Sequence, residues 1–419
     1  MRTTGFLITS IIVLHGIATL SGCMLFRAAD DIRTLEQAAR VAGTTETPQA
    51  TNHPLIVGLV RDADGNKVFA GYHFQRGAGP FEFLMQPGRY HVFAYEDSNE
   101  NLVYDEGEPA YYTGALAPLE AAAGKRLDVG RIRLVNKIPD GVAELRAVVR
   151  RDLELNPELA AHRGTLVTWD DPRFAPGAGP AGMWTPVEAY KQYGAGVFFF
   201  EPYDPARIPV LFVHGISGTA GDFKTIIEKL DRTRFQPWVF QYPSGFRLEL
   251  ISRFLLRTLD ELQAIHKFDR YAIIAHSMGG LVSRAAVNKT VERGATPPIV
   301  LYITISTPWE GHEAAKAGAE YSPVVLPVWL DMVPGSPYLS NLFQTRLPAT
   351  LPYYLIYGYK GGSGTDGTVS LYSVLKLEAQ DQSVRTIGFP EDHRSILQSG
   401  EVIDRLNTLL TSHATSMRR

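Results

Sequence analysis

The sequence predicts a small all-β, sandwich-like domain followed by a larger domain in which a mostly parallel sheet is flanked by helices. Short β-rich runs separated by turn signals such as Pro87-Gly88 fill residues 54–135, with no long amphipathic helix between them. From residue 207 onward, strand-like and helical patterns alternate, which is typical of a parallel α/β sheet. The length of 419 residues favours two domains, and a content of 45% hydrophobic and 20% charged residues indicates a globular chain.

The N-terminus indicates export. Arg2 precedes an apolar run from Gly5 to Leu20, which is short for a membrane span and typical of a secretory signal. The run ends in Leu20-Ser21-Gly22-Cys23, which resembles a bacterial lipobox. This resemblance implies that a signal peptide over 1–22 is removed and that the thiol of Cys23 carries a diacylglycerol. An ordinary signal peptide is the alternative interpretation.

The same features predict the location and partners of the chain. Lipidation of Cys23 predicts an exported protein anchored to a bacterial membrane, with a periplasmic or surface-facing chain. Met24, rather than aspartate, follows the cysteine, and resemblance to the sorting of enterobacterial lipoproteins implies the outer membrane. Cys23 is the only cysteine, so we expect no disulfide framework. The net charge of −3 and the lack of a Lys/Arg-rich stripe in the sequence argue against nucleic acid as a partner. Oligomeric state is left open.

Composition also predicts the boundaries. We expect a tether over 23–53, the β-domain over 54–135, a linker or wrapping segment over 136–200, and the α/β domain over 201–415. Within the linker, residues 145–159 have a helical pattern. The expected strands of the α/β domain are 209–213, 236–242, 271–275, 299–306, 353–357 and 384–388, and its expected helices are 221–230, 248–266, 278–291 and 396–410. The proline-rich segment 307–352 interrupts this alternation, as a cap over a site would. A stabilising excursion with no gating role is the alternative.

Ser277 is the candidate nucleophile. Residues 271–281 read Tyr-Ala-Ile-Ile-Ala-His-Ser-Met-Gly-Gly-Leu, a strand pattern that breaks at a serine and opens into a helical pattern. In a nucleophile elbow the serine has a strained backbone that small neighbours tolerate. Ala275 stands where G-x-S-x-G has its first glycine, and a plain serine N-cap is the alternative interpretation.

A glycine-flanked loop follows an earlier strand. Residues 210–218 read Val-Leu-Phe-Val-His-Gly-Ile-Ser-Gly, and such loops leave backbone N–H groups free. One N–H from this loop and one from the residue after the nucleophile can stabilise an oxyanion, so we assign Ile216 and Met278 to this role. A simple strand-to-helix turn is the alternative.

A serine hydroxyl needs a histidine to take its proton and a carboxylate to orient that histidine. Asp366 is the only acid in the loop after the strand at 353–357, and His393 follows the next strand. The order Ser277, Asp366, His393 is that of α/β-hydrolase triads. Asp331 in the cap is the main rival acid.

Four segments, taken together, resemble bacterial lipases and esterases of the α/β-hydrolase superfamily and related deacylases of glycolipid anchors. They are 213–218, 275–282, 306–311 and 366–369. The resemblance covers about 205–412 and implies acyl transfer to water through a serine ester intermediate, without a cofactor for catalysis. Trp309 and Glu310 stand where lipases often carry histidine or glycine, which puts the substrate pocket in doubt.

An acidic loop in the β-domain matches the spacing of a calcium loop. The candidate oxygen ligands, at positions 1, 3, 5, 9 and 12 of twelve residues, are Asp97, Asn99, Asn101, Asp105 and Glu108. Leu102 replaces the usual glycine at position 6. A structural calcium ion is one interpretation, and an acidic hairpin satisfied by water and its own backbone is the other.

These observations predict a membrane-anchored serine hydrolase that cleaves carboxylic esters with a substantial apolar part, because the triad order is accompanied by an apolar cap at 324–330. The substrate would be an ester or lipid-like small molecule. A surface-binding lipoprotein without activity is a second hypothesis. Acyl transfer to another alcohol, or amide cleavage, would use the same groups and is not separated from hydrolysis by the sequence.

Overall fold

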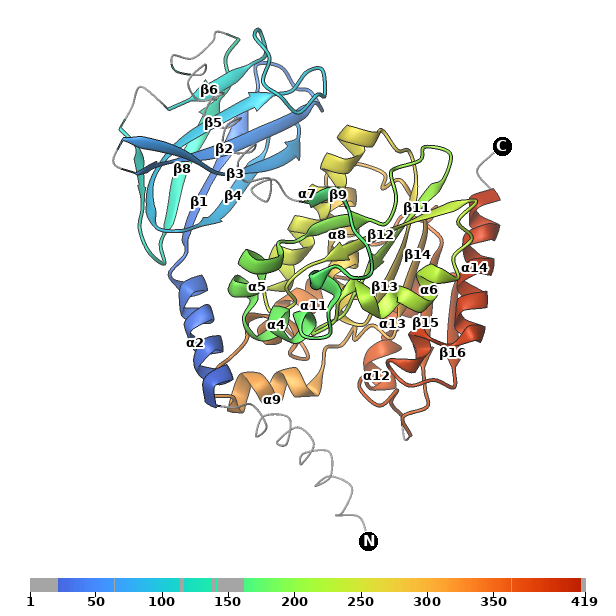
Figure 1. Cartoon of the computed structure of the whole chain (residues 1–419). Helices are drawn as coiled ribbons and strands as arrows, with labels where there is room; N and C mark the ends of the chain where they lie inside the picture. The colour runs from blue at the N-terminus through green and yellow to red at the C-terminus, as the bar shows by residue number, and fades with distance from the viewer. Residues whose placement is uncertain are drawn as a thin grey trace. The chain divides into compact units, whose positions relative to one another are not determined.

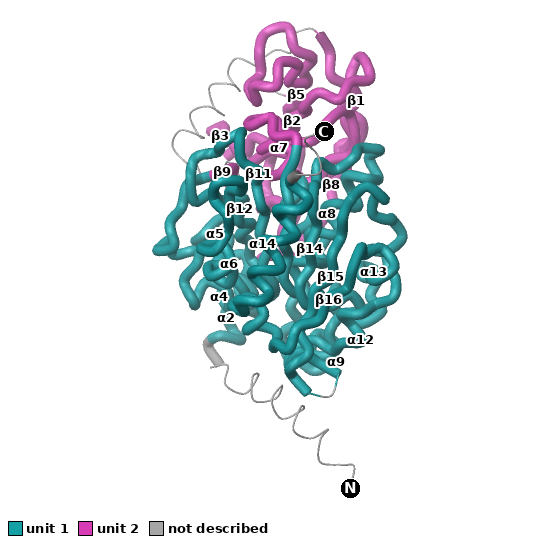
Figure 2. Tube along the Cα trace, turned by 90° about the vertical axis from the view of Figure 1, so that its right-hand side faces the viewer, with its two compact units in different colours: residues 1–32, 165–256, 270–419 teal, residues 33–164, 257–269 magenta. Residues whose placement is uncertain are grey.

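The structure is a computed structural model, and it describes residues 22–63, 65–113, 117–136, 141, 162–362 and 364–415. The chain divides into two compact units, coloured separately in Figure 2. One unit contains residues 33–164 and 257–269, and it is called the β unit below. The other contains residues 1–32, 165–256 and 270–419, and it is called the hydrolase unit. The predicted helix at 145–159 and almost all of the predicted signal peptide lie outside the described residues.

The β unit contains two small sheets. One has the order β4-β1-β8 and the other β3-β2-β5-β6, with β7 paired to β5. The strands are β1 (Ala39–Glu46), β2 (Pro54–Ala63), β3 (Asn66–Arg76), β4 (Pro80–Met85), β5 (Gly88–Glu96), β6 (Ala110–Tyr112), β7 (Leu119–Ala121) and β8 (Arg126–Arg133). Alternate residues of β2, Leu55, Val57 and Leu59, join residues of β1, β4 and β5 in one core. The two sheets therefore share a core, as a sandwich does.

The segment predicted as a tether differs most from expectation. Residues 22–36 form the helix α2 (Gly22–Glu36), and β1 is the middle strand of its sheet. Val41 in β1 is fully buried, so this strand is part of the β-unit core. Composition did not reveal this, because β1 contains two alanines and a glycine, and these residues are depleted in most strands.

The hydrolase unit is built on one eight-stranded sheet with the order β16-β15-β14-β13-β11-β12-β10-β9 (Figure 1). The strands are β9 (His162–Leu166), β10 (Gly196–Phe199), β11 (Ile208–Val213), β12 (Phe235–Gln241), β13 (Tyr271–His276), β14 (Ile299–Ile305), β15 (Tyr353–Gly358) and β16 (Arg385–Phe389). The strands from β11 to β16 pair in parallel, whereas β10 pairs with β12 in antiparallel. β9 and β10 extend the sheet into the segment predicted as a linker, which differs from the predicted boundary at 201.

Helices lie between the strands of this sheet and after the last one. They are α4 (Ala178–Trp184), α5 (Pro186–Tyr193), α6 (Lys224–Glu228), α7 (Leu248–His266), α8 (Met278–Glu292), α9 (Glu313–Tyr321), α10 (Pro327–Met332), α11 (Pro337–Asn341), α12 (Leu371–Val374), α13 (Leu377–Asp381) and α14 (Gly400–Thr415). Short helices α9, α10 and α11 occupy the predicted cap at 307–352. Within the described ranges, no helix is both long and apolar enough to cross a membrane.

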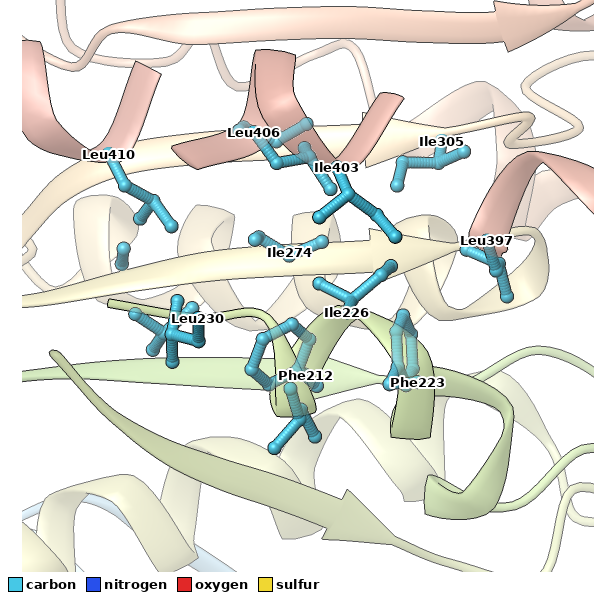
Figure 3. Packing of buried hydrophobic residues seen from close by; sticks show 14 of the residues in the cluster. Phe212, Phe223, Ile226, Leu230, Ile274, Ile305, Leu397, Ile403, Leu406 and Leu410 are labelled. Atoms are coloured by element: carbon cyan, nitrogen blue, oxygen red, sulfur yellow. The ribbon is translucent and has the colours of Figure 1, made fainter. Parts of the chain in front are cut away.

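Apolar residues of α6 and α14 pack on the sheet. Figure 3 shows Ile226 and Leu230 near Phe212, and Ile403 and Leu406 near Ile274. Parallel strands with both faces covered read as continuous apolar runs, and every residue of β11 and β13 is buried. This rigid sheet holds in place the loops at the carboxyl ends of its strands, which carry the candidate site.

Candidate active site

Ser277 lies on a strained turn between β13, which ends at His276, and α8, which begins at Met278. Its φ is 53° and its ψ is −129°, a backbone conformation that residues other than glycine rarely adopt. A side chain at Gly279 would place its Cβ 2.2 Å from the carbonyl oxygen of Val213. The sharp turn and the close approach of α8 to β11 therefore need this glycine. Ala275, where the motif usually has glycine, is fully buried in β13.

Gly215 leaves space for the side chain of Ser277. A Cβ at this position would lie 2.8 Å from the Cβ of Ser277 and 3.3 Å from its Oγ. Any larger residue would therefore cover the hydroxyl. The sequence motif included Gly215 only as a loop glycine, so this contact depends on the fold.

The candidate oxyanion loop is held by side chains on both sides. Ser217, with φ of 55°, donates its N–H to the Oγ of Ser244 at 2.9 Å. The Tyr242 hydroxyl donates to the carbonyl oxygen of His214 at 2.6 Å, and the two rings stack with centroids 4.2 Å apart. Burial lowers the pKa of His214 to about 4, so the ring is neutral near pH 7. His214 thus shapes this loop.

Two N–H groups remain available beside Ser277. The N–H of Met278 belongs to the first turn of α8, where helical N–H groups have no intrahelical acceptor. In the part of the chain that the structure describes, no acceptor takes the N–H of Ile216. These are the two groups that the sequence assigned to the oxyanion.

Asp366 and His393 are joined by a short hydrogen bond. The Nδ1–H of His393 donates to the Oδ2 of Asp366 at 2.7 Å, and the N–H of His393 donates to the carbonyl oxygen of Asp366 at 2.9 Å. The Oδ1 of Asp366 accepts the N–H groups of Thr368 and Val369. Burial raises the pKa of Asp366, but the hydrogen bond and charge of His393 and these two N–H groups outweigh it, so the pKa is lowered overall. Because an ionised carboxylate only accepts, Nε2 of His393 is left with its lone pair.

His276 connects the turn of Ser277 to the loop of His393. Its Nε2 donates to the carbonyl oxygen of His393 at 2.8 Å, and the two rings lie 4.7 Å apart. Burial, followed by the charge of His393, lowers the pKa of His276 to about 3. Ser277 and His393 are largely buried, with 5% and 7% of their surface exposed. Asp366 is fully buried.

His312 supports the loop of the acid, a role that the sequence did not reveal. It lies at the start of α9, where its Nδ1 accepts the N–H of Ala314 at 3.0 Å. This fixes the proton on Nε2, which donates to the carbonyl oxygen of Thr368 at 2.8 Å. The N–H of Thr368 in turn donates to Asp366 at 3.0 Å. His312 lies in the predicted cap at 307–352, and no local pattern in the sequence links it to residue 368.

The structure places the rival acids elsewhere. Asp331 accepts hydrogen bonds from Arg247, at 2.6 Å from Nη2, and from the N–H of Leu248 at 2.7 Å. It therefore stabilises the start of α7. Asp392 accepts the N–H groups of Arg394 and Ser395. Neither carboxylate bonds to His393.

The predicted calcium loop is closed by its own hydrogen bonds. Asp97 accepts the N–H groups of Asn101 and Leu102, and Glu108 accepts those of Ser98 and Asp105. The side-chain amides of Asn99 and Asn101 both donate to Asp105. Across the described ranges, no group of three or more His, Cys, Asp or Glu is arranged to hold a metal. Calcium binding stays a prediction.

The comparisons with known proteins concern the hydrolase unit. Residues 247–407, which include Ser277, Asp366 and His393, match the family described as alpha/beta hydrolase of unknown function (DUF915). Among curated proteins, none matches this chain in sequence.

Solved structures with a similar arrangement are distant. The mature lipase BlEst2 of Bacillus licheniformis is 18% identical, with a TM-score of 0.41, over 51% of this chain and 97% of that one. A thermophilic esterase of Thermogutta terrifontis is 15% identical, with a TM-score of 0.36, over 50% and 91% of the two chains. A Listeria innocua gene product is 14% identical, with a TM-score of 0.38, over 49% and 94%.

The match of residues 247–407 to an alpha/beta hydrolase family agrees with the sheet order and the turn at Ser277. The chain has the α/β-hydrolase fold, preceded by a mostly antiparallel β region.

Proposed function

We propose that this protein is a serine hydrolase that cleaves carboxylic esters through an acyl-enzyme intermediate. Ser277 Oγ attacks the ester carbonyl while Nε2 of His393 takes its proton, and Asp366 stabilises the imidazolium that forms. The N–H groups of Ile216 and Met278 stabilise the oxyanion. His393 then protonates the leaving alcohol, and a water activated by the same nitrogen releases the acid and restores the serine.

The observation that carries this proposal is the 2.7 Å hydrogen bond between Asp366 and His393. It joins loops after two neighbouring strands, β15 and β16, and it fixes the tautomer of a histidine whose loop contacts the turn of Ser277. A structural ion pair would not require the strained backbone of Ser277 as well.

We further propose that the chain is exported and anchored to a bacterial membrane through a lipid on Cys23. The lipobox-like sequence supports this, and the side chain of Cys23 lies outside the described positions. The apolar segment within 307–352 favours an ester with an apolar acyl or alcohol part.

Covalent labelling tests the nucleophile. A fluorophosphonate probe should label the wild-type protein and not Ser277→Ala, and the variant should lose hydrolysis of p-nitrophenyl esters. Ser306 provides the matched control, because it is also a serine with positive φ, 50°, after the neighbouring strand β14. Its Oγ accepts the N–H of Gly358, so Ser306→Ala should still be labelled. Labelling or ester hydrolysis that survives in Ser277→Ala would refute the proposal.

A further inference from the structure

Helix α2, the first described segment, is fixed directly to helix α5 of the hydrolase unit. The carboxylate of Asp31, in α2, accepts the N–H groups of Val187 and Glu188, each at 2.8 Å, in the first turn of α5. Asp31 is 4% exposed, and a carboxylate at a helix N-terminus is favoured by both hydrogen bonding and the helix dipole. An ion pair from Arg27 to Glu188, at 3.0 Å, adds a second contact.

This contact leaves little freedom for a lipid on Cys23. Cys23 and Asp31 lie on the same helix, eight residues apart, and this helical length is about 12 Å. An acyl chain at Cys23 would therefore hold the hydrolase unit at the membrane surface, where the sequence had predicted a tether over 23–53. The inference rests on the lipid attachment proposed above.

An exposed apolar surface lies near the start of α2, which carries the proposed lipid attachment site Cys23. Residues 321–330 read Tyr-Ser-Pro-Val-Val-Leu-Pro-Val-Trp-Leu, without one charged residue. Tyr321 is 80% exposed and Leu330 45%, and Phe26 in α2 is 76% exposed. Pro323 is also exposed, whereas Val324 and Val325 are half-buried. We call the following set the anchor face: Phe26, Tyr321, Pro323, Val324, Val325 and Leu330.

A chain of contacts links α2 to residues 321–330. Trp184, three residues before the Val187 that Asp31 contacts, packs edge-on against Trp329 with ring centroids 5.6 Å apart. Trp329 also lies against Gly318, one helical turn before Tyr321, where a Cβ would be 2.7 Å from the indole. In Figures 1 and 2 the start of α2 and helix α9 lie at the same end of the hydrolase unit.

The anchor face lies at the edge of the sheet that carries the candidate site. The N–H of Val328 donates to the carbonyl oxygen of Gly245 at 3.2 Å, and the N–H of Gly245 donates to Gly182 at 2.9 Å. Gly245 follows the carboxyl end of β12, as Ser277 follows that of β13. A bilayer that contacts the anchor face would therefore approach the edge at which Ser277 lies.

We propose that the anchor face docks on the lipid bilayer that holds the acylated Cys23, and that it orients the carboxyl edge of the sheet toward that bilayer. Residues 321–330 carry no charge, and an aromatic and aliphatic segment of this kind suits the interfacial region of a membrane. A bilayer is the occupant that we infer, because the acylated Cys23 lies three residues before Phe26 on the same helix. The lipid concentrates the enzyme at the membrane, and the face sets its orientation.

Fluorescent labelling at single positions tests this orientation. Cys23 is the only cysteine, so an introduced cysteine is the only free thiol once Cys23 is acylated. Tyr321→Cys is compared with Val384→Cys, which is also exposed, 64%, but lies before the first residue of β16, at the opposite edge of the sheet. Each full-length variant is labelled with an environment-sensitive nitrobenzoxadiazole dye and placed in phosphatidylethanolamine vesicles that contain a minor fraction of phosphatidylglycerol.

The dye at residue 321 should brighten several-fold and be quenched by spin-labelled lipid, whereas the dye at 384 should do neither. Equal responses at the two positions would overturn the proposal. Wild-type protein should take up no dye, and labelling of Cys23 itself would show that the lipid on which the proposal depends is missing. None of these results depends on the nucleophile, so failure of the esterase proposal would be seen separately.

A charge on the anchor face provides an activity test. Tyr321→Glu should lower hydrolysis of a long-chain ester embedded in the same vesicles by about tenfold, because a carboxylate resists transfer into an apolar phase. Hydrolysis of a soluble p-nitrophenyl ester by Tyr321→Glu should be unchanged, and Val384→Glu should change neither rate. A flexible Gly/Ser linker inserted after Cys23 should restore no activity to Tyr321→Glu. Equal loss on both substrates would indicate misfolding, and unchanged hydrolysis of the embedded ester would overturn the proposal.

Discussion

Asp366 in the hydrolase unit and Asp97 in the β unit are both fully buried carboxylates in short loops, and both accept backbone N–H groups of their own loop. They differ in the use of the second oxygen. Both oxygens of Asp97 bond to nearby N–H groups, whereas Asp366 keeps Oδ2 for His393. A loop can therefore hold a carboxylate by itself, but a partner from another strand end gives it a chemical role.

The largest expected effect is the loss of activity when the charge of Asp366 is removed, and the same change at Asp97 is the comparison. Asp366→Asn should lower kcat about a thousandfold or more, because an amide that donates to Nδ1 favours the wrong tautomer of His393. Asp97→Asn should leave kcat unchanged and lower only the melting temperature, because its partners are local N–H groups. Steady-state kinetics with circular dichroism as the folding control separates the two. Full activity in Asp366→Asn would remove the distinction between the loops.

Acidic pH should affect the two buried histidines of the hydrolase unit and Glu108 of the β unit in opposite directions. Burial is the main cause that lowers the pKa of His214 to about 4 and the pKa of His276 to about 3. Between these values and the unfolded pKa of about 6.5, the unfolded chain binds more protons, so stability decreases as the pH falls, by about 2 kcal/mol per histidine at pH 5.

In the calcium-like loop of the β unit, burial is the main cause that raises the pKa of Glu108, so the folded chain holds this proton more tightly than the unfolded chain. The resulting stability is lost as the pH rises through the raised pKa of Glu108. Urea unfolding at pH 7 and pH 5 measures the sum. His276→Gln should make the loss on acidification smaller. An identical pH dependence in wild type and variant would contradict the assignment of His276 as a buried neutral ring.

Calcium tests whether the β-unit loop has a ligand beyond its own N–H groups. If Asp97, Asn99, Asn101, Asp105 and Glu108 bind calcium, an excess of about 100 times the dissociation constant should stabilise the protein by about 2.7 kcal/mol. Asp105→Ala should abolish this rise in melting temperature without changing ester hydrolysis. A melting temperature indifferent to both calcium and excess chelator would leave the loop as an acidic hairpin closed by its own backbone.

The smallest effect concerns His312, which ties the loop of Asp366 to the start of α9. His312→Ala should lower kcat by about tenfold, since a small displacement of Asp366 misaligns His393. His312→Gln can still donate to the carbonyl oxygen of Thr368 and should retain more activity. His413→Ala is the control, because the ring of His413 hydrogen-bonds to the hydroxyl of Tyr354 and not to the loop of Asp366. An alanine variant at 312 with wild-type kcat would assign the residue to packing alone.

Much of the hydrolase unit could be predicted because its signals are local. The apolar runs that became β11, β13 and β14 are buried on both faces, so they read as continuous hydrophobic segments. The glycines around Ser277 mark a turn that few other residues permit. The predicted helix at 396–410 begins later, at Gly400, because residues 395–397 form a separate 3₁₀ turn.

The N-terminal segment could not be predicted from the same kind of signal. The docking of Asp31 on α5 leaves no local pattern, because its partners lie more than a hundred residues away in the sequence. The place of β1 in its sheet leaves none either, because β1 pairs with two different strands. The choice of Asp366 over Asp331 was also open in sequence. It was decided by Arg247, which takes Asp331 as its partner.

The sequence by itself determined the fold class, the candidate nucleophile and the order of the three candidate catalytic residues, since periodicity and turn chemistry act over a few neighbouring residues. Tertiary structure alone decided which carboxylate bonds to His393, that His312 supports the acid loop, and that α2 is fixed on α5. Each of these depends on groups that meet only when separate strand and helix ends are brought to one edge of the sheet. Such contacts are long-range, so no local pattern in the chain encodes them.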